Sequence, residues 1–355
     1  MVLLIFQIVI ILAAAKLAAE ICGRILRIPA VLGELTAGAL IGPFLLGGIA
    51  IKGIGPIFPL ESGSTGFLGA IPMEIYLLGQ IAAVILLFTA GIETDLKQFL
   101  RRIGPATLVA AGGVIFPFVF GVVFTVLMGY ADGFTDPTAL FIGAVLTATS
   151  VGITARVLTD IHKLNSPEGV TIIAAAVVDD VLGILVLTIV VAIAGTNNFS
   201  YSELGFVAIK AIGFWLLLTG GIIFGANWIS KTLLGFRVEG TTIVLALGLA
   251  LAAAALAESF GLAMIIGAYS VGLGLSGTEM AKKIEPQLMG VFHFLVPIFF
   301  VVMGMLTDFS AMREGIVFGL VLTAVAIMVK VLGAGLPSLA GGYNLIGAWR
   351  IGLGM

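Results

Sequence analysis

The sequence predicts an all-α protein that crosses a membrane many times. Hydrophobic residues make up 60% of the 355 positions and charged residues only 10%, which is too little polar surface for a soluble domain of this length. The 48 glycines and 12 prolines would disturb soluble helices, but membrane helices tolerate both. Cys22 is the only cysteine, so the chain forms no internal disulfide and no thiolate metal site.

The apolar residues are gathered into segments long enough to span a bilayer, whose core of about 30 Å needs roughly 20 residues of helix. The first segment follows no basic region and is predicted to be retained rather than cleaved as a signal peptide. Eleven complete segments lie near 2–22, 29–50, 74–93, 105–129, 137–158, 169–194, 204–229, 241–258, 260–277, 289–307 and 315–340, and a twelfth begins at Leu345.

Lysine and arginine alternate between the two sides of the membrane. With the N-terminus outside, only three fall in outer loops, whereas twelve fall in cytoplasmic loops. The outer ones are Lys52, Lys210 and Arg313; the cytoplasmic ones are Arg24, Arg27, Lys97, Arg101, Arg102, Arg156, Lys163, Lys231, Arg237, Lys282, Lys283 and Arg350. Because cytoplasmic loops carry the excess of basic residues, this bias predicts an outside N-terminus.

A short motif occurs twice. The third segment ends in Gly91-Ile92-Glu93-Thr94-Asp95-Leu96, and the tenth ends in Gly304-Met305-Leu306-Thr307-Asp308-Phe309. Both copies read Gly-x-x-Thr-Asp followed by an apolar residue, and the second copy comes seven segments after the first, so they end on opposite sides of the membrane. Two related units of opposite orientation are typical of inverted-repeat transporters.

Two adjacent carboxylates, Asp179 and Asp180, lie in the middle of the sixth segment, about ten residues from either end. A charge at this depth costs several kcal/mol unless it is paired or hydrated, so ionisable residues here indicate function. Adjacent helical residues point about 100° apart, so the two carboxylates need not share one role. A carboxylate that binds either a proton or a small hard cation is the minimum for cation/proton exchange. The alternative is a polar clamp between helices.

Lys330 lies deep in the eleventh segment, and its natural partner is Asp179 or Asp180 at similar depth. The alternative is that its side chain reaches a water-filled crevice. Glu34, in the second segment, is a candidate for an access path or an interface, with a hydrogen-bonded structural role as the alternative.

The fifth segment is a poor continuous helix because Thr147, Thr149, Ser150, Gly152 and Thr154 fall within eight positions. Such a stretch can unwind and turn its carbonyl and hydroxyl oxygens toward a cation. Packing between helices is the alternative use of these residues.

Four motifs, at 33–38, 86–93, 146–156 and 175–183, resemble the monovalent cation/proton antiporters, in particular the NapA-type sodium/proton antiporters of bacteria. The resemblance covers nearly the whole chain. It implies a homodimer in which 1–103 and 236–312 form the dimerisation domain, 104–195 and 313–355 the core domain that moves, and 196–235 a linker helix. The family has thirteen helices, so the resemblance also implies that the chain ends at the start of the twelfth.

The resemblance also implies a site. Asp180 would be the main carboxylate for the cation, Asp179 would pair with Lys330, and the unwound part of the fifth segment would be Thr149-Ser150. An Asp-Asp pair is the pattern of electrogenic members. The function implied is exchange of Na⁺ or Li⁺ for H⁺ across the cytoplasmic membrane by alternating access, with no cofactor and no nucleic acid partner.

Three other functions are alternatives to this exchange. A K⁺/H⁺ or mixed-specificity electroneutral antiporter stays open, because a carboxylate pair does not select ion size. A Na⁺-coupled symporter of an organic anion would need more polar residues in the core than the sequence offers. A membrane enzyme is disfavoured, since no metalloprotease motif, serine/lysine dyad or phosphate loop lies in these segments.

Overall fold

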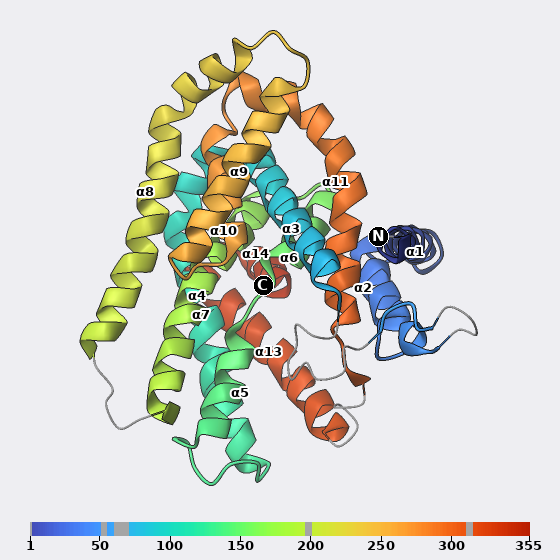
Figure 1. Cartoon of the computed structure of the whole chain (residues 1–355). Coiled ribbons are helices and arrows are strands. Elements are labelled where there is room, and N and C mark those ends of the chain that lie inside the picture. The colour runs from blue at the N-terminus through green and yellow to red at the C-terminus, as the bar shows by residue number, and fades with distance from the viewer. Residues whose placement is uncertain (1, 51–54, 60–70, 196–200, 310–314) are drawn as a thin grey trace.

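The computed structural model describes residues 2–50, 55–59, 71–195, 201–309 and 315–355. These residues are almost entirely helical, and ten of the helical spans in this part of the chain are long and apolar enough to cross a membrane. The predicted all-α membrane fold is therefore confirmed (Figure 1). The basic residues Lys52 and Arg313 lie outside the described residues.

The helices follow the predicted segments in order. They are α1 (Val2–Glu20), η1 (Ile21–Leu26), α2 (Ala30–Ile41), η2 (Leu46–Gly48), α3 (Met73–Glu93), α4 (Leu96–Leu127), α5 (Pro137–Thr147), α6 (Val151–Asp160), α7 (Pro167–Gly195), α8 (Tyr201–Leu234), α9 (Thr241–Ser259), α10 (Met264–Leu275), α11 (Glu279–Met305), α13 (Ile316–Ala340) and α14 (Leu345–Gly354).

Three segments differ from simple spanning helices. The second, expected over 29–50, forms the 12-residue helix α2 and then the short helix η2. The fifth is divided into α5 and α6 by the non-helical residues 148–150. The ninth, expected over 260–277, forms only the 12-residue helix α10. Gly261, at φ +82°, turns the chain sharply just before it, a conformation that glycine adopts without steric cost. Within α10, ten residues are buried, so packing rather than length determines its place.

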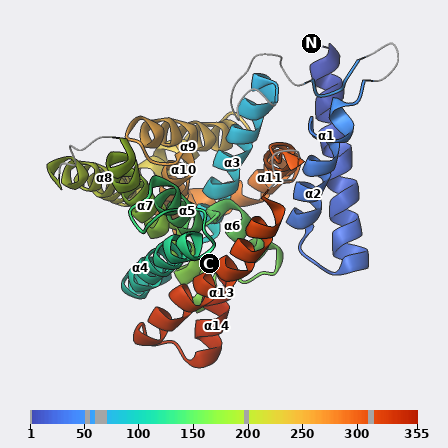
Figure 2. The same ribbon diagram turned by 90° about the horizontal axis from the view of Figure 1, so that it is seen from below.

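The helices pack in two groups (Figures 1 and 2). In the first, α2 packs on α1 and α11, and α3 packs on α10 and α11, with α9 beside α10. In the second, α4 packs on α5, α7 and α13, and α14 packs on α13. Helix α6 contacts α2 and α3 of the first group and α7 of the second. The predicted domain boundaries at 196 and 313 lie outside the described residues.

The repeated motif occupies equivalent places in the first group. Gly91 of α3 packs against the backbone of Tyr269 in α10, and Gly304 of α11 packs against the backbone of Leu35 in α2. Each glycine approaches so closely that a Cβ would collide with a carbonyl oxygen. If α1–α3 and α9–α11 are taken as two three-helix units, the last helix of each unit therefore contacts the middle helix of the other.

The middle helices repeat the same relationship. Gly38 of α2 packs on the carbonyl oxygen of Val301 in α11, and Gly272 of α10 packs on that of Phe88 in α3. Val301 and Phe88 each precede their motif glycine by three residues. The three-helix units α1–α3 and α9–α11 therefore make reciprocal contacts, as expected if the repeated motif marks two related units.

Candidate functional site

The break between α5 and α6 creates two helix ends, of which Thr147 is buried and Ser150 is exposed. Thr147 ends α5, and Ser150 begins α6 as its N-cap, with its hydroxyl accepting a hydrogen bond from the Ile153 backbone N–H at 3.3 Å. Ala148 and Ser150 have extended backbone angles. Serine is a favoured N-cap because its hydroxyl satisfies an otherwise free amide. The interruption that the hydroxyl-rich sequence predicted is therefore present at these residues.

Thr149 lies in the middle of the break, beside Asp179. Its Oγ1 is buried and, among the described residues, has no hydrogen-bond partner. The carbonyl groups that end α5 and the amides that begin α6 flank this break, and such helix ends carry partial charges that attract ions.

Helix α7 carries both carboxylates past this break. Asp179 is buried, and Asp180 is partly buried. Oδ2 of Asp180 is buried and has no hydrogen-bond partner within the described residues. A cavity of about 310 Å³ between α5 and α7 reaches both aspartates. On another side, Asp180 shares a small pocket with Leu87 of α3 and Tyr269 of α10, so it lies between the two packing groups.

Lys330 of α13 reaches into the same region. Its Nζ lies 3.4 Å from Oδ1 of Asp179 and donates to the carbonyl oxygens of Thr147 at 2.7 Å and Gly113 at 2.8 Å. The structure therefore brings Asp179, rather than Asp180, to Lys330. The carbonyl partners were not anticipated, because backbone groups leave no mark in a sequence.

Glu34 is fully buried on α2 and lies away from the aspartate pair, facing Arg156 of α6. The placement of Arg156 in a cytoplasmic loop was wrong: it lies within α6 and is 5% exposed. The sequence offered one signal of this, since Arg156 and Asp160 are four residues apart and can pair along a helix. Their side chains do so at 3.2 Å.

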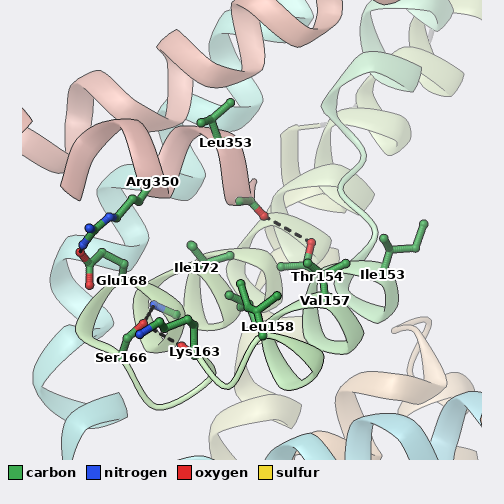
Figure 3. Close-up of a pocket in the computed structure, with 13 residues that line it drawn as sticks. Ile153, Thr154, Val157, Leu158, Lys163, Ser166, Glu168, Ile172, Arg350 and Leu353 are labelled. Carbon is green, nitrogen blue, oxygen red and sulfur yellow. Dashed lines mark hydrogen bonds and ion pairs between the residues drawn. The ribbon is translucent and has the colours of Figure 1, made fainter. Parts of the chain in front are cut away.

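The predicted twelfth segment begins at Leu345 as expected and forms α14, whose Gly354 carbonyl oxygen lies 3.4 Å from the hydroxyl of Thr154 in α6. A cavity of about 580 Å³ between α6, α7 and α14 lies beside this contact (Figure 3). Arg350 of α14 pairs with Glu168 of α7 at 2.9 Å on its wall (Figure 3). Neither aspartate lines this cavity.

A buried charged centre beside a broken helix, within a bundle of membrane-spanning helices, defines a polytopic membrane transporter. The family model for the transmembrane sodium/hydrogen exchanger matches residues 9–355, and the chain belongs to this family of transporters.

Similar proteins agree with this assignment. The chain is 36% identical to a Bacillus cereus protein named "Probable Na(+)/H(+) antiporter GerT", over 99% of this chain and 86% of that protein. It is 35% identical to the Synechocystis "High-affinity Na(+)/H(+) antiporter NhaS3", over 92% of this chain and 74% of that protein. The sodium proton antiporter MjNhaP1 of Methanocaldococcus jannaschii has the same fold, with a TM-score of 0.73 at 20% identity over 99% of this chain and 81% of that structure.

Proposed function

We propose that this protein exchanges Na⁺ for H⁺ and that Asp180 is the carboxylate for which the two ions compete. The observation that carries the proposal is the buried Oδ2 of Asp180, which has no hydrogen-bond partner in the described part of the chain, with the hydroxyl of Thr149 close to the neighbouring Asp179. Buried polar atoms are ordinarily satisfied. A hard monovalent cation, or a proton, would satisfy this oxygen.

The second hydroxyl, on Ser150, has a different role in this proposal. Its oxygen already accepts the capping hydrogen bond from Ile153. It remains able to accept a cation contact through its other lone pair, while the cap holds the start of α6 in place. Thr149 is therefore the stronger candidate for a direct ligand, and Ser150 for a ligand that also positions the break.

The coupling follows from competition at one carboxylate. When Asp180 is protonated it has lost the charge that attracts a cation, so it carries either ion but not both. We assign the moving core domain to α4–α7 with α13 and α14, and the dimerisation domain of a homodimer to α1–α3 with α9–α11. Asp180 lies between these groups, against Leu87 and Tyr269, where movement of one group past the other would expose it to alternate sides.

We further propose that Asp179 is the second proton-linked group and that exchange is electrogenic, with two protons for each Na⁺. Lys330 supports this assignment because its ammonium keeps two carbonyl partners if Asp179 leaves it. Asp179 can therefore take up a proton without leaving a buried ammonium unsatisfied, which would be costly.

We also propose the membrane in which the protein lies and the cations that it carries. The distribution of basic residues favours an outside N-terminus in the cytoplasmic membrane. Li⁺ is a second substrate expected of an oxygen-lined site. K⁺ is the competing candidate, because the chain is also 33% identical, over 99% of its length and 84% of the other protein, to the "Na(+)/H(+)-K(+) antiporter GerN" of Bacillus cereus.

The test is proton movement in proteoliposomes of the full chain after a sudden Na⁺ gradient, with Li⁺ and K⁺ in parallel. Asp180→Asn should abolish cation-driven proton movement, whereas Asp132→Asn, in the exposed loop after α4, should leave it unchanged. Exchange that persists in Asp180→Asn overturns the mechanism. Repeating the assay with the membrane potential clamped tests electrogenicity, which predicts a rate that depends on the potential.

A further inference from the structure

The charged residues Glu34 and Arg156 have no part in the exchange described above, yet they meet across the boundary between α2 and α6. Arg156 Nη2 lies 3.9 Å from Glu34 Oε1, and the side chains are 6% and 0% exposed. That distance makes an ion pair but exceeds a hydrogen bond. Arg156 also lies over the ring of Phe292 in α11, with 5.0 Å between Cζ and the ring centre.

This pair is poorly suited to stabilising the fold. Neither carboxylate oxygen of Glu34 nor Nη1 of Arg156 has a hydrogen-bond partner among the described residues. A buried ion pair recovers the cost of desolvating its charges only when its remaining donors and acceptors are satisfied. Two apolar residues would stabilise this contact at least as well, so stability alone does not account for the two charges.

Each charge also has an opposite charge nearby on its own side of the boundary. Arg156 Nε donates to Oδ2 of Asp160 on α6 at 3.2 Å. Glu34 is within electrostatic range of a second cation, Lys16, on the neighbouring helix α1. When the contact between α2 and α6 opens, Arg156 keeps its ion pair with Asp160 and Glu34 keeps the longer-range attraction of Lys16. Opening is therefore less costly than for an isolated buried pair.

Helix α6 connects this contact to the candidate ion site. It is one ten-residue helix that begins after Ser150 in the break and carries Arg156 in its second half. A displacement of Arg156 relative to α2 therefore moves the break as well. Its two partners across the boundary, Glu34 and Phe292, both belong to the group that contains α2 and α11.

From this geometry we infer that Glu34 and Arg156 form an ionic latch that holds α6 against α2 in the present conformation and opens when the core group moves. The two are positioning residues: they set the balance between the conformations that face the two sides of the membrane. The inference rests on the proposed exchange. Because apparent affinity scales with the population of the binding-competent state, opening the latch should change the KM for Na⁺ differently on the two sides.

The experiment measures KM for Na⁺ from each side of proteoliposomes of the full chain and takes the ratio. Glu34→Gln and Arg156→Gln should each shift the ratio about fivefold or more in the same direction. The double variant should shift it no further, since both changes remove one interaction. Arg156→Lys, which keeps the charge, should retain most of the parent ratio. The matched control is Glu20→Gln, which removes an exposed pair with Arg24 at 3.6 Å and should leave the ratio unchanged.

Unchanged ratios in Glu34→Gln and Arg156→Gln, or shifts that add in the double variant, overturn the latch while leaving the exchange intact. If Glu34→Gln does not fold, the test compares the KM ratio of Arg156→Gln with that of Arg156→Lys. Equal ratios in these two variants overturn the latch. A parent protein that moves no protons in response to Na⁺ overturns the exchange, and the latch with it.

Discussion

Lys330 Nζ lies closer to two backbone carbonyl oxygens, of Thr147 at 2.7 Å and Gly113 at 2.8 Å, than to its carboxylate partner Asp179, at 3.4 Å. An ammonium has three N–H donors, and these three oxygens can accept all of them. Thr147 is the last residue of α5, where a cation complements the negative end of the helix dipole. Lys330 therefore joins α4, α5, α7 and α13 at one point.

Lys330→Gln is predicted to destabilise the protein by about 3 kcal/mol, because it leaves a buried carboxylate without its cation. Thermal unfolding in detergent measures this, with the exposed Lys231→Gln as the control. The same substitution should shift the pH dependence of Na⁺-driven exchange. An unshifted profile would remove Asp179–Lys330 from the coupling mechanism, even if stability falls as expected.

Thr149→Val is predicted to raise the KM for Na⁺ about tenfold, the effect of losing one favourable contact to a charged group. Stability should fall only slightly, because Thr149 Oγ1 makes no close hydrogen bond within the described residues and would lose only its looser contact with Asp179. Thr149→Ser keeps the hydroxyl and should bind Na⁺ normally. Thr36→Val, on an exposed position of α2, is the control. A normal KM in Thr149→Val would exclude this oxygen as a cation ligand.

Gly38→Ala and Gly272→Ala are predicted to destabilise the protein by about 1–3 kcal/mol each, the usual cost of an extra group in a packed core. In both cases the new Cβ would meet a carbonyl oxygen of another helix, at Val301 or Phe88. Gly248→Ala in α9, where a Cβ meets nothing within 4 Å, should be neutral or stabilising. Thermal unfolding tests all three, and unequal losses at Gly38 and Gly272 would argue against equivalent packing.

Asp95 should contribute a pH-dependent part of the stability. It caps α4, and the hydrogen bond from the Gln98 backbone N–H, at 3.0 Å, holds the pKa of the Asp95 carboxyl below its usual range. A depressed pKa stabilises the fold above the unfolded pKa of about 3.9, and this is lost as the pH falls through the folded value. Asp95→Ala is predicted to cost about 1 kcal/mol at neutral pH.

Unfolding of the parent and of Asp95→Ala at pH 7 and at pH 3 tests this. The difference between them should shrink at the lower pH. A difference that stays constant would mean that the carboxylate charge is not what stabilises the start of α4. Asp132→Ala, in the exposed loop after α4, controls for loss of an acidic side chain.

Much of the fold could be predicted because a membrane constrains it strongly. Length and hydropathy identified the segments, since only helices of about 20 residues satisfy their backbone inside a bilayer. The hydroxyl-rich run located the break at 148–150. The ninth segment was predicted too long because its apolar residues continue through the turn at Gly261. Arg156 was misplaced because a basic residue near a segment end is more often solvated than buried.

The sequence by itself determined that the chain spans a membrane, that its fifth helix breaks at a hydroxyl-rich run, and that charges lie inside the bilayer. Those properties depend on composition and local order. The pairing of Lys330 with Asp179 was implied by the family resemblance, but tertiary structure alone decided that Lys330 also meets two carbonyl oxygens, that Glu34 faces Arg156, and that the two three-helix units exchange their glycine contacts. Such contacts depend on how each helix is rotated and how deep it sits, and these are set by packing between residues far apart in the chain.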